Sequence, residues 1–481
     1  MKTIELGLNP FGSVNGSVFA SGEVTRRRFV QSVGATFAAC SIPTTVRAQG
    51  EVDLVAVEGE VQLAPSGYPK TTIWGYDGAV PGPTIRVRQG ERVARRFVNR
   101  LPQASSIHWH GIRLENKMDG VVGLTQDEVA SGEVFSYDFV APDAGTYLYH
   151  PHNRSWEQMA RGLSGALIVE EQDGTPEVDA DQVLLIDDWR LTDQAQIAGG
   201  FGDLHDWAHA GRIGNWITVN GMGGWRSTSQ RYARLRLRLI NAATARVFVL
   251  EAEGLEGWVV ALDGMPLETP QPLSQLVLGP AQRADVIVDV TTEEGQEAKL
   301  ISVERNGSFV VGTYAVNGSA RVQRLDKPKP LPSNSVPTLG PLASARRAEL
   351  VMEGGAMGRM RGATMNGRPA TMNKLMAAGK VWSFNGSVDM PAEPLVEGAQ
   401  GETIRVQIRN DTAWPHAMHL HGHHFRQVKE GRLGTLRDTL LMQRGESAEI
   451  AFVADNPGDW LLHCHMLSHS AGGMMTWLRV T

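Results

Sequence analysis

Pairs of histidines separated by a single residue are the feature of this sequence with the clearest chemistry. Fourteen histidines scattered at random over 481 positions would form roughly 0.4 such pairs, whereas the chain contains five. The pairs lie in IHWHG (His108, His110), YHPHN (His150, His152), HAMHLHGHH (His419, His421, His423) and HCHM (His463, His465). Because imidazole is the commonest protein ligand of metal ions, the set indicates metal binding.

Strand geometry gives this spacing a meaning, because side chains alternate between the two faces of a β-strand. Two histidines with one residue between them then point to the same side. In HCH the two histidines point one way and Cys464 points the other. If HAMHLH is also extended, His419 and His421 share one face and His416 is turned to the opposite face. The carboxyl-terminal region therefore predicts two metal sites, one on each face.

The first predicted site combines a thiolate with two imidazoles and a thioether, from Cys464, His416, His469 and Met474. These are the ligands of a blue-copper electron-transfer centre. Structural zinc is the alternative, but such a site closes with four ligands and has no use for methionine. The second site has eight candidates, which fit a cluster of two or three ions: His108, His110, His150, His152, His419, His421, His463 and His465. Cys464 is covalently bonded to His463 and to His465, both candidates for the second site. An electron therefore has a short bonded route between the two sites.

Cysteine usage agrees with a metal-bound thiol. The chain has two cysteines, Cys40 near the amino terminus and Cys464 in the HCH motif. If the first is removed with a signal peptide, the exported chain has one thiol and can form no internal disulfide. A free thiol oxidises readily outside the cytoplasm, and metal ligation would protect it.

The amino terminus reads as a twin-arginine signal peptide, predicted at residues 1–48. TRRRFV precedes a mildly apolar stretch, and VRAQ offers a cleavage site after Ala48. We expect export by the twin-arginine machinery to the periplasm as a soluble product, because no other stretch is long and apolar enough to span a bilayer. Lipoprotein anchoring at Cys40 is not expected, since Phe37 fits the start of that motif poorly. Cleavage would move the net charge from −6 to about −9, which disfavours nucleic-acid binding.

Short alternating runs punctuated by turns predict an all-β fold. The 53 glycines and 24 prolines fit many turns, and runs such as RLRLRLINA and TIRVQIRND recur at the spacing of β-sandwiches. Two blocks end alike, in APDAGTYLYHPH and ADNPGDWLLHCH, which indicates an internal repeat. We predict three consecutive sandwich domains, at 51–172, 178–325 and 348–481, with an extended proline-rich connector at 326–347.

In their order and position, the motifs HWHG, HPH, HAMHLHG and HCHMLSHSAGGMM resemble those of the multicopper oxidase family of laccases and cuprous oxidases. The resemblance covers essentially the whole chain after the predicted signal. It implies three cupredoxin-like Greek-key domains holding four coppers. Type 1 copper would be held by His416, Cys464, His469 and Met474, type 2 copper by His108 and His419, and the paired type 3 coppers by His110, His150 and His465 on one side and His152, His421 and His463 on the other.

The resemblance also implies the reaction. Phenolic or aromatic-amine donors, or Cu(I), would be oxidised one electron at a time at type 1 copper, and O2 would be reduced to water at the cluster. Cys464 and Asp119 are the predicted catalytic residues, because Asp119 matches the acid that assists proton delivery in the family; a DG pair is also typical of a turn. Ser470 departs from the pattern, since many bacterial members have an acid there. A second proton relay therefore stays open.

Several further side chains are given no ligand role. His423 and His424 are expected near the cluster or at the surface, and His205 and His209 on a solvated helix in preference to an accessory metal site. The segment Met352 to Met376 contains six methionines. Its thioethers suit Cu(I), but methionine also fills gaps in a core, and the sequence does not choose between these roles.

Alternatives to an oxidase make different predictions about the ligand set. A copper nitrite reductase would leave the eight-histidine set unexplained. A periplasmic copper-binding or sequestering protein without turnover, or a cupredoxin scaffold, belongs to another class; the scaffold predicts missing ligands, and none is missing.

Overall fold

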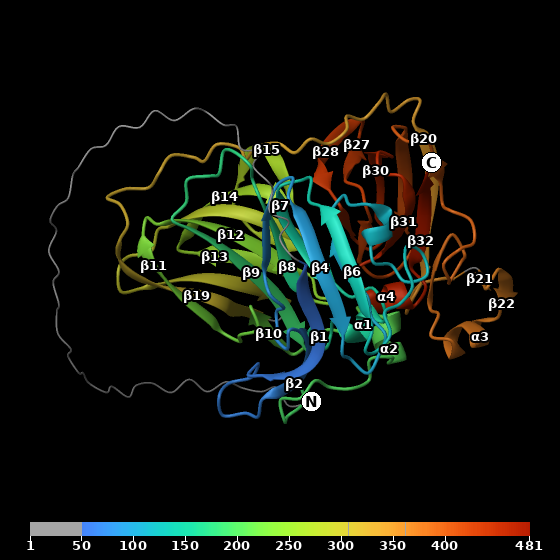
Figure 1. The fold of residues 1–481 in the computed structure, drawn as a ribbon, viewed down its shortest axis with the longest axis horizontal. Helices are drawn as coiled ribbons and strands as arrows, with labels where there is room; N and C mark the ends of the chain where they lie inside the picture. Colours follow the sequence, from blue (N-terminus) through green and yellow to red (C-terminus); the bar gives the residue numbers. More distant parts are fainter. Residues whose placement is uncertain (1–50, 306, 361) are drawn as a thin grey trace, which may run out of the picture. The chain divides into compact units, whose positions relative to one another are not determined.

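The computed structural model describes residues 51–305, 307–360 and 362–481. The predicted signal at 1–48, with the arginines of TRRRFV and with Cys40, lies outside the described residues. The described chain consists mainly of β-strands, which pack as three sandwiches in sequence order (Figure 1). The predicted all-β fold is confirmed, and the predicted domain limits stay predictions.

The first sandwich has two four-stranded sheets, with strand orders β2-β1-β4-β6 and β3-β8-β7-β5. In each sheet an early strand pairs in parallel with a later one, β1 with β4 and β3 with β8, because the chain crosses between the sheets. The elements are β1 (Val52–Val61), β2 (Thr71–Tyr76), β3 (Ile85–Arg88), β4 (Arg92–Asn99), β5 (His108–His110), the 3-10 helix η1 (Asn116–Met118), β6 (Val134–Val140), β7 (Gly145–His150), α1 (Ser155–Gln158) and β8 (Gly165–Glu170).

The middle sandwich has sheets with strand orders β10-β9-β12-β17-β14-β15 and β11-β19-β18-β13-β16. Its elements are β9 (Ala180–Trp189), α2 (Leu204–Ala208), β10 (Trp216–Val219), β11 (Trp225–Arg231), β12 (Arg234–Asn241), β13 (Phe248–Glu253), β14 (Leu255–Leu262), β15 (Met265–Pro272), β16 (Leu276–Leu278), β17 (Arg283–Val290), β18 (Glu297–Glu304) and β19 (Gly307–Ser319). The described residues of the following connector form no helix or strand before β20.

The third sandwich has sheets with strand orders β23-β20-β25-β30-β27-β28 and β24-β32-β31-β26-β29, and β21 and β22 form a separate hairpin. Its elements are β20 (Arg346–Gly354), β21 (Ala363–Met365), β22 (Arg368–Ala370), α3 (Met372–Ala377), β23 (Trp382–Phe384), β24 (Glu397–Gly398), β25 (Thr403–Asn410), β26 (His416–Leu420), β27 (Phe425–Lys429), β28 (Arg432–Arg437), β29 (Thr439–Met442), β30 (Ser447–Val453), β31 (Gly458–Cys464), α4 (Leu467–Ala471) and β32 (Met475–Val480).

The first and third sandwiches share a buried apolar core, which runs from Trp109 and Tyr149 to Trp460 and Leu462. The middle sandwich has a core of its own. The histidine motifs lie on strands of these two sandwiches. A continuous core fixes the positions of those strands, because protein interiors are packed as closely as organic crystals. Among the described helices, none has the length and apolar character needed to cross a membrane.

Strand β12 shows how the alternating pattern of RLRLRL is used. Its leucines point into the core of the middle sandwich. Its arginines, on the other face, are equally buried and form ion pairs. Arg236 is 1% exposed and donates hydrogen bonds to Glu171, in the segment after the first sandwich, and to Asp285 of β17. The arginine face thus joins the middle sandwich to the chain that precedes it.

Replacing Arg236 by Met should destabilise the chain strongly, because Glu171 would remain buried without its cation. Removing one partner of a buried pair costs about 3 to 5 kcal/mol. The control is Arg92→Met, which breaks an exposed pair with Asp138 (side chains 61% and 47% exposed) and should cost less than about 1 kcal/mol. Denaturant midpoints measure both effects, and equal shifts would contradict a structural role for the arginine face of β12.

Candidate metal centres

Strand pairing brings the histidine motifs together. In the first sandwich β5 pairs with β7 so that His108 lies opposite His150. In the third, β26 pairs with β31 so that His419 lies opposite His463, and Met418 lies opposite Cys464. Residues opposite each other in a sheet project to the same face. His463 and His465 therefore gather on one face with His419 of β26, and Cys464 occupies the other face, on the side of His416.

Cys464, His416 and His469 form the first group of side chains, and all three are buried. The Cys464 Sγ atom lies 3.6 Å from Nδ1 of His416 and 3.9 Å from Nδ1 of His469, and the two Nδ1 atoms are 3.1 Å apart. Each residue comes from a different element, namely β26, β31 and α4. Three soft or borderline donor atoms thus converge on one point, as a copper or zinc ion requires.

The remaining ring nitrogens of this group are fixed by hydrogen bonds. The Thr412 hydroxyl donates to Asn410 Oδ1 and accepts a bond of 2.8 Å from Nε2 of His416. Nε2 of His469 donates to the backbone oxygen of His209, at 2.7 Å. In both rings Nε2 therefore carries the proton and Nδ1 presents its lone pair. Outer partners of this kind orient metal-binding histidines.

Burial sets the protonation of the group. It lowers the pKa of His469 to about 4 and that of His416 well below the ordinary value, so both rings stay neutral. It also raises the pKa of the Cys464 thiol to about 12. A thiol in such an apolar place ionises only when a cation compensates the charge, and metal binding supplies one.

Met474 lies buried directly before β32. Its N–H donates to the backbone oxygen of His469, and its own oxygen accepts from the N–H of Cys464 at 3.1 Å. Two backbone bonds therefore hold Met474 beside the first group. Ser470, which stands where the resemblance leads one to expect an acid, is also buried, in α4.

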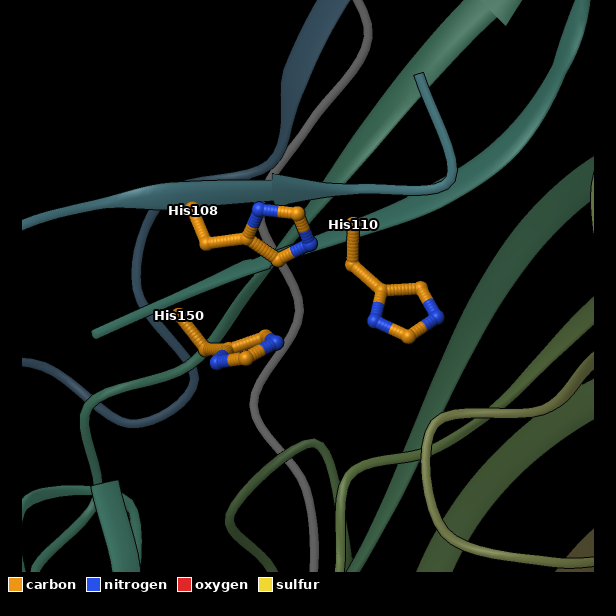
Figure 2. A group of neighbouring side chains, drawn as sticks. All are labelled: His108, His110 and His150. Carbon is orange, nitrogen blue, oxygen red and sulfur yellow. The ribbon is translucent and has the colours of Figure 1, made fainter. Parts of the chain in front are cut away.

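Eight imidazoles form the second group, with residues from the first and third sandwiches in contact. The ring of His108 stacks on that of His421 with centroids 3.9 Å apart, and His110 stacks on His419 at 3.6 Å. Nε2 of His150 lies 3.2 Å from Nε2 of His465. His152 and His463 complete the group, with centroids 5.2 Å apart. Figure 2 shows the rings of His108, His110 and His150 gathered in one region.

Most rings of the second group turn a free nitrogen inward. Nδ1 donates to a backbone oxygen in His108 (Asp119), His419 (Asp438), His463 (Cys464) and His150 (Pro151). Within this group, the buried ring nitrogens without a hydrogen-bond partner in the described structure are Nε2 of His108, His419, His421 and His463, and Nδ1 of His110 and His465. Unpaired buried polar atoms are costly. Their convergence fits metal ions, which would satisfy them.

Burial also keeps most imidazoles of the second group neutral. Burial lowers the pKa of His152 to about 3 and lowers the pKa of His110, His150, His421, His463 and His465 well below the ordinary value, with neighbouring imidazoles adding to the effect. Neutral imidazole is the form that binds metals. The second group offers only nitrogen donors, and the first combines two nitrogen donors with the Cys464 sulfur. Both sets suit copper.

Asp119 touches two of these rings. It directly follows η1 and is 1% exposed. Its Oδ2 atom accepts a 2.9 Å bond from Nδ1 of His421, and its backbone oxygen accepts one from Nδ1 of His108. The DG pair is therefore more than a turn, because the carboxylate contacts the histidine group directly.

Sequence reasoning missed Asp438 and its partner Arg283. Asp438 is fully buried and contacts His110 and His419. Burial would raise the pKa of Asp438, but Arg283 and His110 outweigh this and hold the pKa well below its usual range. Asp438 has no motif around it, since an isolated acid in LRDT looks like any other surface charge. Only the fold shows its position.

Two expectations about other histidines need correction. His423 and His424 are both buried, so the surface alternative is wrong; His423 donates to the backbone oxygen of His421. The rings of His205, in α2, and His209, directly after it, stack with centroids 4.1 Å apart. His205 is exposed, as a solvated helix predicts, but His209 contacts His469 through its backbone oxygen. Helix α2 thus borders the first group.

The methionine segment contains buried, half-buried and exposed residues, with Met360 and Met365 half-buried against a small apolar cluster. Met352 lies in β20 and is fully buried in the shared core, so it fills space. Met357, Met372 and Met376 are 79%, 47% and 47% exposed. The backbone N–H of Ala356, next to Met357, donates to the oxygen of Ala208 in α2. The exposed thioethers therefore belong to a segment that contacts the helix bordering the first group.

Comparison with known proteins identifies relatives along most of the chain. Family models described as multicopper oxidase match residues 58–174, 180–307 and 364–481. The structure of Lac15 from a marine microbial metagenome is similar, with 42% sequence identity, a TM-score of 0.73, and coverage of 89% of this chain and 100% of that one. Copper resistance protein A homolog of Pseudomonas syringae pv. tomato is 26% identical over 89% of this chain and 92% of its own. Laccase-1 of Botryotinia fuckeliana is 28% identical over 86% and 79%.

Removing copper should lower the unfolding temperature, because the ion binds the folded arrangement of imidazoles and has little affinity for the unfolded chain. Copper at 100 times its dissociation constant adds about 2.7 kcal/mol of stability per site. Calorimetry of chelated and reloaded protein measures the difference. It should shrink in a His108→Ala, His421→Ala variant and persist in a His205→Ala, His209→Ala control. An equal copper-induced shift in the first variant would contradict metal binding by the second group.

Proposed function

The chain belongs to the multicopper oxidase family, and from this premise we propose that it couples one-electron oxidation of small donors to the four-electron reduction of O2 to water. As a family member it is a copper-dependent oxidoreductase. The observation that carries the proposal is the placement of Cys464 on one face of β31 and of His463 and His465 on the other. One strand then serves both the electron-accepting and the oxygen-reducing site.

The proposed ligands follow the two groups. Type 1 copper would be held by His416, Cys464, His469 and Met474, type 2 copper by His108 and His419, and the type 3 pair by His110, His150 and His465 and by His152, His421 and His463. Copper in these places would supply one-electron redox chemistry at the first group and O2 reduction at the second. The unpartnered ring nitrogens of the second group support this assignment.

The chain supplies the path between the groups. The Cys464 carbonyl oxygen accepts a 3.0 Å hydrogen bond from Nδ1 of His463. An electron leaving the Cys464 sulfur has this bonded route to His463 and a purely covalent one to His465. The Asp119 carboxylate, in contact with His421, is proposed to deliver protons. Ser470 is buried and has no acidic group to donate a proton. Proton delivery is therefore proposed for Asp119.

Donors are proposed to reach the first group beside α2. One curated relative is named a laccase and another a copper resistance protein, which supports keeping phenols or aromatic amines and Cu(I) as the two donor classes. The exposed Met357, Met372 and Met376 are soft ligands suited to Cu(I). Export by the twin-arginine route, with residues 1–48 as the signal, and a periplasmic location remain part of the proposal.

Replacing Cys464 by Ser should abolish both the intense visible absorption and oxygen uptake with either donor, because a hydroxyl cannot replace the thiolate. Met418→Leu is the matched control: Met418 is buried opposite Cys464 in β26, and the change conserves volume. The control should keep colour and turnover. Oxygen uptake by the serine variant would contradict the assigned electron entry. Coloured, copper-loaded wild-type protein without uptake would support the sequestering alternative.

The role of the exposed thioethers in Cu(I) oxidation can be tested by substitution. Deleting the whole segment would also remove the end of core strand β20. The variant Met357→Leu, Met372→Leu, Met376→Leu keeps apolar bulk and removes sulfur. We expect Cu(I)-dependent oxygen uptake to fall several-fold while uptake with a methoxyphenol is unchanged. Met222→Leu, at a methionine of the middle sandwich that is 48% exposed, controls for surface change. Equal rates with Cu(I) in both variants would count against a Cu(I) role for the segment.

A further inference from the structure

A second buried carboxylate, besides Asp119, contacts the eight-histidine group. The Oδ1 atom of Asp438 accepts hydrogen bonds from Nε2 of His110, at 3.3 Å, and from the Thr439 hydroxyl, at 2.7 Å. The backbone oxygen of the same residue accepts from Nδ1 of His419, at 2.9 Å. Asp438 therefore holds one ring with its side chain and a second ring with its backbone.

Arg283 of the middle sandwich holds Asp438 in place. Its Nη1 and Nη2 atoms donate to Oδ1 and Oδ2 of Asp438 at 2.9 and 2.6 Å. Nε donates to the backbone oxygen of Thr146 in the first sandwich. Arg283 is fully buried, and a bidentate guanidinium fixes a carboxylate in position and in orientation. One arginine thus links all three sandwiches beside the histidine group.

The glycine of the HWHG motif makes room for this ion pair. Gly111 has a φ of +87°, and a Cβ atom there would lie 2.4 Å from Nη2 of Arg283 and 2.5 Å from Oδ2 of Asp438. Any larger residue would displace the pair. The residue directly after His110 therefore fits the same arrangement that holds the His110 ring.

His110 is bound in a different way from four other rings of the group, although His465 also leaves Nδ1 without a partner. His108, His419, His421 and His463 each donate from Nδ1 and leave Nε2 without a partner. In His110 the bond to Asp438 uses Nε2, and Nδ1 is the atom without a partner. The carboxylate selects the tautomer with the proton on Nε2, because it can only accept.

We propose that Asp438, held by Arg283, is a positioning residue that makes Nδ1 of His110 the metal-binding atom and fixes the ring toward the cluster. The middle sandwich, which carries no ligand motif, thereby contributes to assembly of the cluster. The inference rests on the proposed function, because it assumes that copper binds the eight-histidine group.

The test measures copper per chain, the electron paramagnetic resonance signals of the two kinds of site, and the melting temperature of the copper-free chain. In Asp438→Ala and Arg283→Met we expect copper content to fall by at least half, with the absorption of the thiolate site retained. Asp438→Asn keeps an acceptor oxygen for His110 and should retain more copper than Asp438→Ala. The retained thiolate absorption shows that the variants are folded.

Arg234→Met is the matched control, because Arg234 forms a buried bidentate pair with Asp289 within the middle sandwich. It should lower the melting temperature and leave copper content unchanged. Full copper loading and unaltered cluster signals in both Asp438→Ala and Arg283→Met would overturn the inference, as would the same copper loss in Arg234→Met. Wild-type protein that binds no more than one copper would instead refute the proposed function.

Discussion

The two-residue period of strand β31 is the constraint on which the two groups depend. Cys464 points to one face of the strand, where His416 and His469 lie, and the histidines on either side of it point to the other. The two groups are therefore a few bonds apart and still separate, without a dedicated connecting element. Moving the pairing of β26 and β31 by one residue would exchange the faces and mix thiolate with cluster imidazoles. Correct register is thus as important as the ligands themselves.

Register alone does not make the groups, because neutral imidazoles must be buried with their lone pairs aligned. The backbone does most of this. Carbonyl oxygens of Asp119, Asp438 and Cys464 accept the outer protons of rings from both sandwiches. Since each acceptor belongs to a strand end or a turn next to a ligand strand, the sheet positions the ligand and its partner together. Burying the unpaired inner nitrogens makes the free energy of folding less favourable, and metal binding offsets this.

The sequence was sufficient for what depends on local periodicity. It predicted an all-β fold and the two faces of HCH, because a period of two can be recognised within a few residues. Most of the proposed ligands lie together in the structure, but His469 and Met474 follow from their place after Cys464 and from the family resemblance, and the ligand assignment stays a prediction. The sequence could not supply Asp438, Arg283 or Thr412, which are single polar residues without a pattern of their own. Burial of His423 and His424, and the approach of α2 to His469, also depend on contacts between segments distant in the chain. Such contacts follow from packing of whole sandwiches and leave no local signal.

The middle sandwich shows what those distant contacts achieve. It carries none of the proposed ligands, yet it contacts both groups: the His209 oxygen accepts from Nε2 of His469, and Arg283 binds Asp438 beside His110. The His209 oxygen contacts Nε2 of His469 directly, whereas Arg283 acts on Nε2 of His110 only through Asp438. Outer hydrogen-bond partners orient metal-binding imidazoles. The first and third sandwiches supply most of these partners, and the middle sandwich takes part at His469 and, through Asp438, at His110. The middle sandwich therefore acts as an outer support for rings at both sites, which gives a physical reason for three domains where two carry the ligands.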